Sequence, residues 1–519
     1  MKLSFFLIAF ISFTCTLYAQ SITASFSKSE SLPDKHKFSR IIAMENDQEG
    51  GVVIIRAYYG GFILKLKGYY LEHYNKDLEL INEYTYEAPD AEVMGVITAG
   101  NYSTIIEVLY DTEQEHYMYR AQRIDLKNFD LQTKTLFSFK RAQEKSINFL
   151  TNYSVPFNDK LYSQLLKDSS GSYFAIAVDS KETGKDTHQV WFFDADLHVL
   201  QQYDLKNETK TRHFVFENFE SDASGKTFYL LGKAYEKGKR TRSVSLKYRY
   251  ELLKITENED AVRQYFEKED GYPSSLKMII TGNTLKAVGF YSNTSDRKYR
   301  GLVYLELDPK TLAIREQVFN PFSKQFMEDK YGAETDKELK NLAFRGIYHT
   351  EEGDIVFNAE EEYVTSRFKH TSSDNRVQVN QYHYNDIVCA RLNASGKMEW
   401  ARNINKAEIT LGDEAFVSYL SAVQGGQAFF FINSGAEPQR ISGERILFKK
   451  GYSKNPEMFI LNIDKKGTLS YAKVTSKQEV RLPIMVSKGV VCKDGANAFF
   501  LARRGSRKQL IKVHFETVN

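Results

Sequence analysis

Three consecutive carboxylates, Glu360, Glu361 and Glu362, offer the kind of oxygen ligand that Ca²⁺ takes in proteins. In an extended strand, alternate side chains point to opposite faces, so Glu361 would point away from its two neighbours. The three carboxylates therefore cannot converge on one ion unaided. We interpret this run as the solvated end of a strand and predict no metal site.

A polar segment follows this run and is rich in Tyr, Arg and His, which suit contacts with a protein or a glycan. The residues that we predict to bind a ligand are Glu360, Glu362, Tyr363, Arg367, His370, His383 and Tyr384. His370 and His383 fall in what the sequence suggests is one long loop. They are weak metal-ligand candidates, and exposed histidines are the interpretation that we favour.

Two common hydrolase motifs, G-x-S-x-G and H-E-x-x-H, do not occur in the sequence. A pair of glycosidase carboxylates remains open, because its spacing is spatial and 67 acidic residues offer many pairs. The segment from Asn393 to Trp400 resembles the tryptophan-docking motif of quinoprotein dehydrogenase propellers. Only this copy carries the Trp, so we interpret it as a hairpin turn with one packed Trp and predict no cofactor.

The charge balance of the chain excludes some partners. The 519 residues carry 70 Lys and Arg against 67 Asp and Glu, for a formal net charge of +3. We therefore expect no nucleic-acid partner. Apolar residues make up 42% of the chain, which is enough to fill a large core and excludes a disordered chain.

The N-terminus has the pattern of a secretory signal peptide: one Lys, a short apolar run and Ala19 before a cut. We predict a signal peptide over 1–19 and a mature chain that starts at Gln20. No stretch reaches the ~18 apolar residues that a transmembrane helix needs. We expect an exported protein that is periplasmic, or extracellular and associated with the outer membrane.

A glycine turn followed by an apolar strand recurs eight times. From Gly51 to Gly495 the chain covers 444 residues in seven intervals, about 63 per unit. Each unit has an apolar run before its glycine and two or more after it, which we name strands a, b, c and d. The units start near residues 38, 92, 161, 213, 276, 341, 416 and 484.

Four antiparallel strands repeated eight times predict an all-β fold, a single β-propeller over 20–519 with eight four-stranded blades. The last unit lacks its fourth strand, and we expect residues 21–27 to supply it and to close the ring. A ring of seven blades and two stacked β-domains are the alternatives. We also expect a helix within 326–342, capped by Thr335 or Asp336, and a helical turn within 140–166.

This arrangement predicts the state of the two cysteines and the face on which the long connections lie. Cys389 and Cys492 fall in different units, so we expect two separately buried thiols rather than a disulfide. Most of the long connections join strand b to strand c and therefore lie on one face of the ring. They cover residues 181–188, 233–242, 292–300, 365–384 and 433–455. Loops on a rigid scaffold commonly carry function, although unselected loop drift is the alternative.

The segment 341–404 resembles a recurring segment of uncharacterised exported, β-propeller-like proteins of the Bacteroidetes. The matching features are NLAFRGIYHTEEGDIVFNAEEEYV, then a loop rich in Tyr, Ser, Asn, Gln and His, then YNDIVCARLNASGKMEWARNI. The signal ending Tyr-Ala-Gln is also similar to that group. The resemblance implies an exported propeller-like protein to which no reaction is assigned.

These observations favour a non-catalytic binding or scaffold protein that holds a protein or glycan on the face with the long connections. The alternative is a glycan-active enzyme, a hydrolase or lyase, with its site in the central funnel. A third hypothesis is a sensor or scaffold partner of another envelope protein. We expect a monomer.

Overall fold

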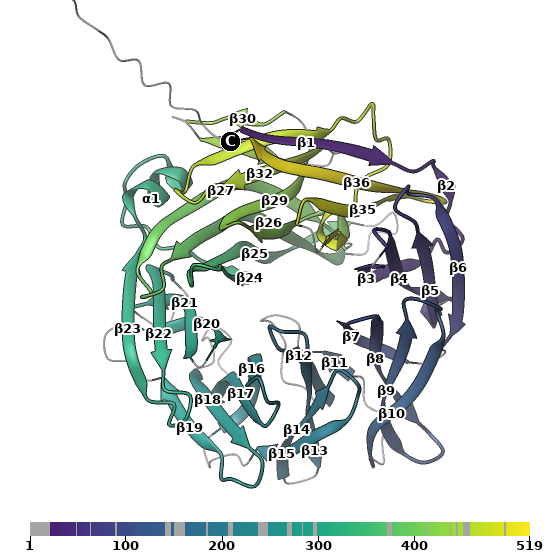
Figure 1. Ribbon diagram of the computed structural model, residues 1–519, viewed down its shortest axis with the longest axis vertical. Helices are drawn as coiled ribbons and strands as arrows, with labels where there is room; N and C mark the ends of the chain where they lie inside the picture. Colours follow the sequence, from purple (N-terminus) through teal and green to yellow (C-terminus); the bar gives the residue numbers. More distant parts are fainter. Residues whose placement is uncertain are drawn as a thin grey trace, which may run out of the picture.

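The segments rich in Val, Ile, Phe and Tyr form strands in the computed structural model, as β-propensity predicts. The structure describes residues 21–518 except 48, 63, 89–90, 141–146, 150–160, 183–184, 206–210, 237–247, 267–271, 283, 294–297, 371–375, 413, 436, 443–444, 450–456 and 493–494. Within these residues the strands pair into eight sheets, which surround a common centre in Figure 1. The all-β prediction is confirmed, and the layout is that of a β-propeller.

The first five sheets follow one another in chain order, with neighbouring strands consecutive in sequence. The first sheet is β3 (Ser39–Asn46), β4 (Val52–Gly60), β5 (Lys65–Tyr74) and β6 (Leu80–Glu87). The second is β7 (Glu92–Ala99), β8 (Tyr102–Asp111), β9 (His116–Asp125) and β10 (Leu131–Lys140). The third is β11 (Ile147–Phe149), β12 (Leu161–Lys167), β13 (Tyr173–Glu182), β14 (Lys185–Asp194) and β15 (Val199–Leu205). The fourth is β16 (Thr211–Ser221), β17 (Thr227–Glu236), β18 (Tyr248–Thr256) and β19 (Val262–Phe266). The fifth is β20 (Tyr272–Thr281), β21 (Thr284–Ser292), β22 (Gly301–Leu307) and β23 (Ile314–Pro321).

The last three sheets surround the candidate site. The sixth is β24 (Leu342–His349), β25 (Ile355–His370), β26 (Arg376–Leu392) and β27 (Met398–Thr410), with β31 (Ile446–Lys449) and β30 (Gln439–Arg440) added at its edge. The seventh is β28 (Tyr419–Gln424), β29 (Gln427–Ser434), β32 (Glu457–Ile463) and β33 (Leu469–Thr475). The eighth is β34 (Val490–Val491), β35 (Asn497–Arg504), β36 (Arg507–Val518) and β1 (Ser21–Lys28), and β2 (Leu32–Pro33) also pairs with β36.

The two ends of the described chain share the eighth sheet. β1 pairs antiparallel with β36 from Ser21 opposite Val518 to Lys28 opposite Ile511. Figure 1 shows the two strands side by side. The prediction that 21–27 supplies the missing strand of the last unit is confirmed by this register.

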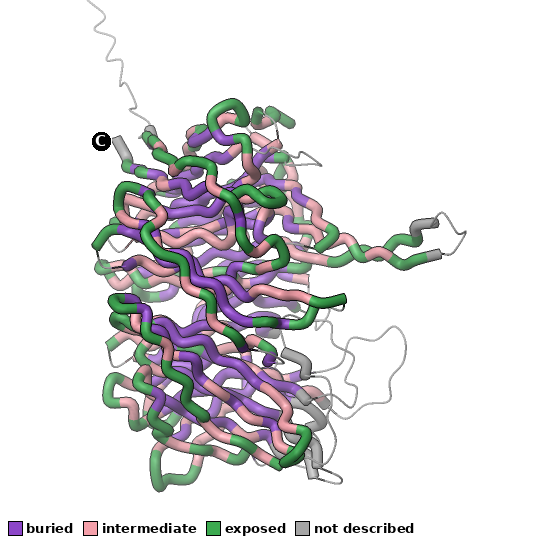
Figure 2. Tube along the Cα trace, turned by 90° about the vertical axis from the view of Figure 1, so that its right-hand side faces the viewer, coloured by how far each residue is buried: buried purple, intermediate pink, exposed green. Residues whose placement is uncertain are grey.

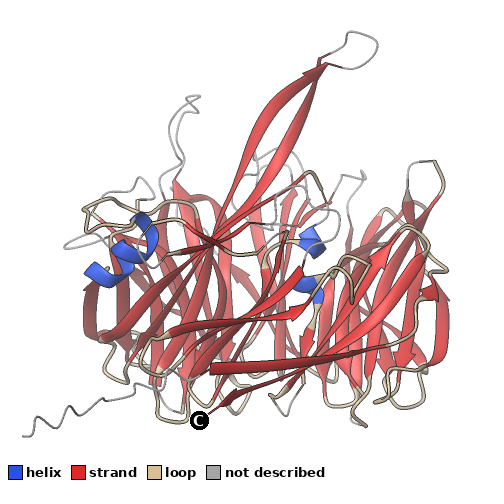
Figure 3. Ribbon diagram, turned by 90° about the horizontal axis from the view of Figure 1, so that it is seen from above, coloured by secondary structure: helices blue, strands red, loops and turns tan. Residues whose placement is uncertain are grey.

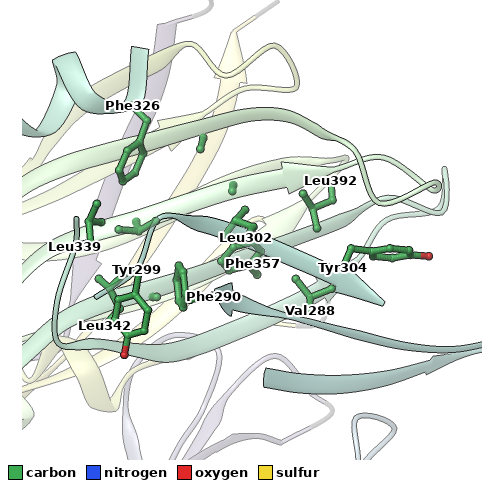
Figure 4. Packing of buried hydrophobic residues seen from close by; sticks show 14 of the residues in the cluster. Val288, Phe290, Tyr299, Leu302, Tyr304, Phe326, Leu339, Leu342, Phe357 and Leu392 are labelled. Carbon is green, nitrogen blue, oxygen red and sulfur yellow. The ribbon is translucent and has the colours of Figure 1, made fainter. Parts of the chain in front are cut away.

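The glycine turns between strands a and b take the backbone conformation that their residue type suggests. Gly171 has φ 72° and Gly225 has φ 67°, both in the left-handed region that side chains disfavour. Apolar side chains of neighbouring sheets pack against one another in buried clusters. Figure 4 shows one such cluster, which includes Phe290 of β21, Phe357 of β25 and Phe326 of the helix α1 (Lys324–Tyr331).

The segment 365–384, expected as a loop, is instead a continuation of two strands. β25 and β26 stay paired as far as His370 opposite Arg376. Figure 3 shows a long two-stranded hairpin projecting from one face, and Figure 2 shows that its outer part is exposed or half-buried. The polar residues alternate with Val and Tyr, a pattern that suits a strand with two solvated faces better than a loop.

The helix prediction was right in kind and wrong in its boundaries. α1 covers Lys324–Tyr331 and begins after Ser323, whose side chain accepts a hydrogen bond from the N–H of Phe326 at 3.2 Å. Gly332, with φ 79°, ends it before Thr335 and Asp336. Of the helical turn expected within 140–166, the stretches 141–146 and 150–160 lie outside the described residues. Residues 147–149 form β11, which is parallel to β12.

The connection 433–455 also holds secondary structure that the sequence did not suggest. β31 pairs in parallel with β27, from Asn405 opposite Leu447 to Ala407 opposite Lys449. The seventh unit therefore reaches back and adds strands to the edge of the sixth sheet. Two 3-10 turns, η1 (Glu414–Phe416) and η2 (Val486–Lys488), precede β28 and β34.

Two further expectations concern the cysteines and the membrane. Cys389 is buried on β26 and Cys492 is half-buried after β34, and the two are not bridged, as predicted. Within the part of the chain that the structure describes, no helix is long and apolar enough to cross a bilayer.

Candidate functional site

A polar pocket of about 310 Å³ lies where the sixth, seventh and eighth sheets meet, at the base of the projecting hairpin. We call it the hairpin-base pocket. In each of the three units, lining residues come from strand a or from the segment just before it. Tyr384 of β26 also lines the pocket. The lining residues are Arg345, Tyr348, Tyr384, Glu414, Ser418, Tyr419, Leu420, Ser421, Ser487 and Lys488.

Arg345 on β24 joins two carboxylates of the neighbouring strand β25. Its guanidinium lies 2.9 Å from Glu360 Oε2 and 3.0 Å from Glu362 Oε2. Burial raises the pKa of Glu362; Glu360 adds to that rise and Arg345 opposes it. The two glutamates share a face while Glu361 pairs with Lys330 of α1, so the predicted alternation is confirmed.

The interpretation of this run as a solvated strand end was wrong for Glu360. Its side chain is 0% exposed, and its Oε1 accepts from Lys406 at 2.8 Å. The same ammonium, also 0% exposed, bonds Glu408 Oε2 at 2.7 Å. The two carboxylates keep the pKa of Lys406 above its ordinary value, although burial alone would lower it. No local sequence pattern indicates this ion pair, because Lys406 lies 46 residues after Glu360.

Ser418 connects this buried ion network to the seventh sheet. Its Oγ donates to Glu360 Oε2 at 2.6 Å, and its N–H donates to Glu408 Oε2 at 2.7 Å. Its φ of 68° lies in the left-handed region, which is uncommon for a residue with a Cβ. The two hydrogen bonds to buried carboxylates offset this strain and fix the wall of the pocket.

Glu414 of η1 also lines the pocket. Its carboxylate accepts from Tyr384 at 3.3 Å and from Lys488 at 3.0 Å. Burial alone would raise the pKa of Glu414, but the Lys488 ammonium and its hydrogen bond outweigh burial and hold the pKa below its ordinary value. The hydroxyl of Ser487 donates to the Glu414 carbonyl at 2.9 Å and so ties η2 to η1.

The inner wall is a set of hydroxyl and amide groups. Tyr348 OH lies 2.9 Å from Ser421 Oγ, and Tyr419 OH donates to Asn358 Oδ1 at 2.7 Å. Asn358 in turn donates to Ser421 Oγ at 3.3 Å. Burial raises the pKa of both tyrosines, so they are neutral donors and acceptors at any physiological pH.

The structure brings together three of the seven predicted site residues. Glu360 and Glu362 pair with Arg345 beside the pocket, and Tyr384 lines it. Tyr363 and His383 are opposite one another in the hairpin and their rings stack with centroids 4.4 Å apart, outside the pocket lining. Arg367 is exposed farther out on β25. His370 ends β25, and its side chain lies outside the described residues.

Sequence reasoning missed Arg345, Glu414, Ser418 and Lys488. Arg345 lies in strand a of its unit, and the other three lie just before strand a, on connections from strand d to strand a. In an up-and-down blade these connections lie on the same face as the connections from b to c. That rule is the signal by which the sequence indicates the three residues on these connections.

Two other predicted features have clear positions. Trp400 of β27 packs on Gly467 of the seventh unit, and its indole N–H donates to the carbonyl of Lys465 at 3.0 Å. The Trp therefore docks between neighbouring blades, as a structural group. Among the described residues, no three His, Cys, Asp or Glu side chains are grouped so that they could hold a metal ion.

The fold and the site together define a propeller-like protein with a polar pocket at the base of a projecting hairpin. No protein-family model matches the chain. No curated protein matches its sequence. The strand pairing and the pocket geometry of this chain therefore carry the functional argument.

Solved structures with a similar arrangement have low identity and low TM-scores. The β-propeller domain of the Trilobed protease from Pyrococcus furiosus is 10% identical at TM-score 0.34, covering 85% of this chain and 98% of that one. The polysaccharide lyase Uly1 is 11% identical at TM-score 0.36, covering 84% and 92%. Prolyl oligopeptidase B from Galerina marginata is 10% identical at TM-score 0.38, covering 90% of this chain and 56% of that one. With TM-scores below 0.5, none of these carries an argument about this protein.

Proposed function

We propose that this protein is an exported binding protein, an eight-bladed propeller closed by β1. It holds a protein or glycan ligand on the face that carries the projecting hairpin, and it catalyses no reaction on that ligand. The hairpin-base pocket carries this proposal, because three separate sheets place polar side chains around one concavity. Binding sites are commonly concave, pre-formed and few in number.

The pairing of charges inside the pocket favours binding over catalysis. Arg345 is committed to Glu360 and Glu362, and Lys488 is committed to Glu414. These ion pairs fix the side chains before a ligand arrives, which lowers the entropic cost of binding. A binding site benefits from such preorganisation without needing a group poised to transfer a proton.

Direct binding measurements test the proposal. The mature chain, immobilised on a biosensor, is exposed to soluble polysaccharides and to purified envelope proteins of the source cell. Tyr384→Phe removes one pocket hydroxyl, and Tyr471→Phe, an exposed tyrosine on β33, is the matched control. We expect one ligand whose affinity falls with Tyr384→Phe alone. Binding that neither variant changes places the ligand elsewhere, and no binding at all contradicts the proposed function.

Export and a monomeric state belong to the same proposal, and both can be measured on the secreted protein. Mass spectrometry of its N-terminus is expected to give Gln20, and light scattering after gel filtration is expected to give one copy per particle. An intact N-terminus on protein that stays in the cytoplasm contradicts export.

A glycan-active enzyme is the second candidate, and the two carboxyl groups beside Tyr384 favour it. The pKa of Glu362 is raised and that of Glu414 is lowered. The two pKa values therefore differ in the way that they do in enzymes that use one carboxyl group as an acid and another as a base. Glu362→Gln and Glu414→Gln would then each abolish release of reducing ends or of unsaturated products. If the wild-type protein releases neither from any polysaccharide that it binds, this candidate is excluded.

A further inference from the structure

We infer that the hairpin-base pocket binds the end of a neutral saccharide chain and discriminates against acidic sugars. This inference rests on the proposed binding function and specifies the ligand for which the pocket is built.

The first argument is the count of hydrogen-bond donors and acceptors in the pocket. The protons of Tyr384 and Ser487 are already donated, to Glu414 in both cases, and that of Ser418 is donated to Glu360. The oxygen atoms of these hydroxyls keep acceptor capacity, as do the carboxylates. These hydroxyls and carboxylates supply acceptors, and Arg345 and Lys488 supply N–H donors beside them. Sugar hydroxyls can both donate and accept, so they complement this mixture.

The second argument is charge. Four carboxylates lie in and beneath the pocket against three cations, and every one of those cations is within 3.0 Å of a carboxylate oxygen. The carboxylates are Glu360, Glu362, Glu408 and Glu414, and the cations are Arg345, Lys406 and Lys488. The pocket lining itself holds Arg345 and Lys488 against Glu414, and both cations are already paired with carboxylates. A uronate or sulfate would have to break one of these ion pairs, which costs free energy in a partly buried site. A cationic ligand would compete with Arg345 and Lys488 for the same carboxylates. A neutral ligand avoids both costs.

The third argument is shape. The volume of about 310 Å³ is at the lower end of the range of ligand pockets, roughly 300–1,000 Å³. That volume suits one or two sugar units, so the pocket takes a chain end rather than a long internal stretch. Tyr348, Tyr384 and Leu420 add apolar surface to the lining, on which the C–H faces of a sugar ring can pack.

Calorimetry with short saccharides of known charge tests the inference. The neutral probes are maltotriose, cellotriose and N,N′,N″-triacetylchitotriose, the acidic probe is trigalacturonate and the cationic probe is trilysine. We expect at least one neutral probe to bind and neither charged probe to bind. Glu414→Gln changes the carboxylate that lines the pocket and replaces one acceptor oxygen with a donor at nearly constant size. We expect it to weaken the neutral probe about tenfold, the loss of one hydrogen bond to a charged group.

The matched control is Glu437→Gln, the same chemical change at an exposed residue that pairs with Lys473. We expect it to leave the affinity unchanged. Tyr384→Phe is a second pocket variant that keeps the ring, and the thermal midpoint of each variant shows whether it is folded. A folded Glu414→Gln or Tyr384→Phe that binds like wild type overturns the inference.

The other outcomes separate the inference from the proposed function. Binding of trigalacturonate or trilysine in place of the neutral probes overturns the inference and leaves a binding protein. If no saccharide binds at millimolar concentration while a purified envelope protein does, the inference again fails and the proposed function stands. If nothing binds in either experiment, both fail.

Discussion

Lys406 and Glu360 form an ion pair from which water is excluded: Nζ lies 2.8 Å from Oε1, and neither side chain is exposed. The other oxygen of Glu360 accepts from Arg345, which lines the hairpin-base pocket. The geometry of the pocket therefore depends on a buried charge network that joins β25, β27 and β24.

Replacing Lys406 with Met should destabilise the protein strongly. Two carboxylates, Glu360 and Glu408, would stay buried without their cation, a change that typically costs about 3–5 kcal/mol. Urea unfolding followed by tryptophan fluorescence measures the loss. Lys473→Met is the control, because its partners include the exposed Glu437, and we expect it to cost about 1 kcal/mol or less. Equal losses in the two variants would contradict a special role for the buried network.

Deleting Ser21–Lys28 should expose the edge of β36. Eight residue pairs are lost, and the freed backbone donors and acceptors invite pairing with another chain. We expect a lower thermal midpoint and association that increases with protein concentration, measured by light scattering after gel filtration. A synthetic peptide of sequence SITASFSK should reverse both effects. A monomeric deletion variant with an unchanged midpoint would show that β1 does not contribute to the stability of the ring.

Gly467→Ala should be more harmful than Gly505→Ala. Both glycines have positive φ, 82° and 58°, so both substitutions carry the left-handed penalty of about 1–2 kcal/mol. A Cβ at Gly467 would also meet Trp400 Cγ at 2.8 Å, whereas nothing lies within 4 Å of a Cβ at Gly505. The difference between the two thermal midpoints therefore measures the packing of Trp400 between blades. If the two variants melt together, that packing adds nothing.

Glu220 should make stability fall as the pH rises toward neutrality. Burial raises its pKa from 4.5 to about 7, while Ser169 of the third sheet's turn donates to it at 2.7 Å. Between these two values the folded protein keeps the proton that the unfolded chain loses. The stabilisation present below pH 4.5 is lost on the way to pH 7, by about 3 kcal/mol.

The variant Glu220→Gln isolates this effect, because the amide oxygen can still accept from Ser169 but cannot ionise. We expect it to melt at a higher temperature than wild type at pH 8 and at a similar temperature at pH 5. Parallel pH profiles for the two proteins would assign the pH dependence to other groups.

The sequence by itself determined the repeat and most of the strands. Glycine turns such as Gly171 and the two-residue period of the flanking runs are local properties, so they can be read along the chain. The incomplete last unit identified β1 as the partner of β36, because a missing strand leaves an edge that must be paired. The same two-residue period correctly placed Glu361 on the opposite face of the strand from Glu360 and Glu362.

Only the tertiary structure decided what surrounds those glutamates. Ser418 and Lys488 reach the pocket region from later units, and Lys406 reaches Glu360 from β27 of the same sheet. Which cation meets which carboxylate depends on how three sheets pack around a common centre. The sequence pattern of β25 is the same whether its end is solvated or covered by a neighbouring blade. Burial, and with it the paired charges that favour a neutral ligand, follows from contacts between residues far apart in the chain, which no local period encodes.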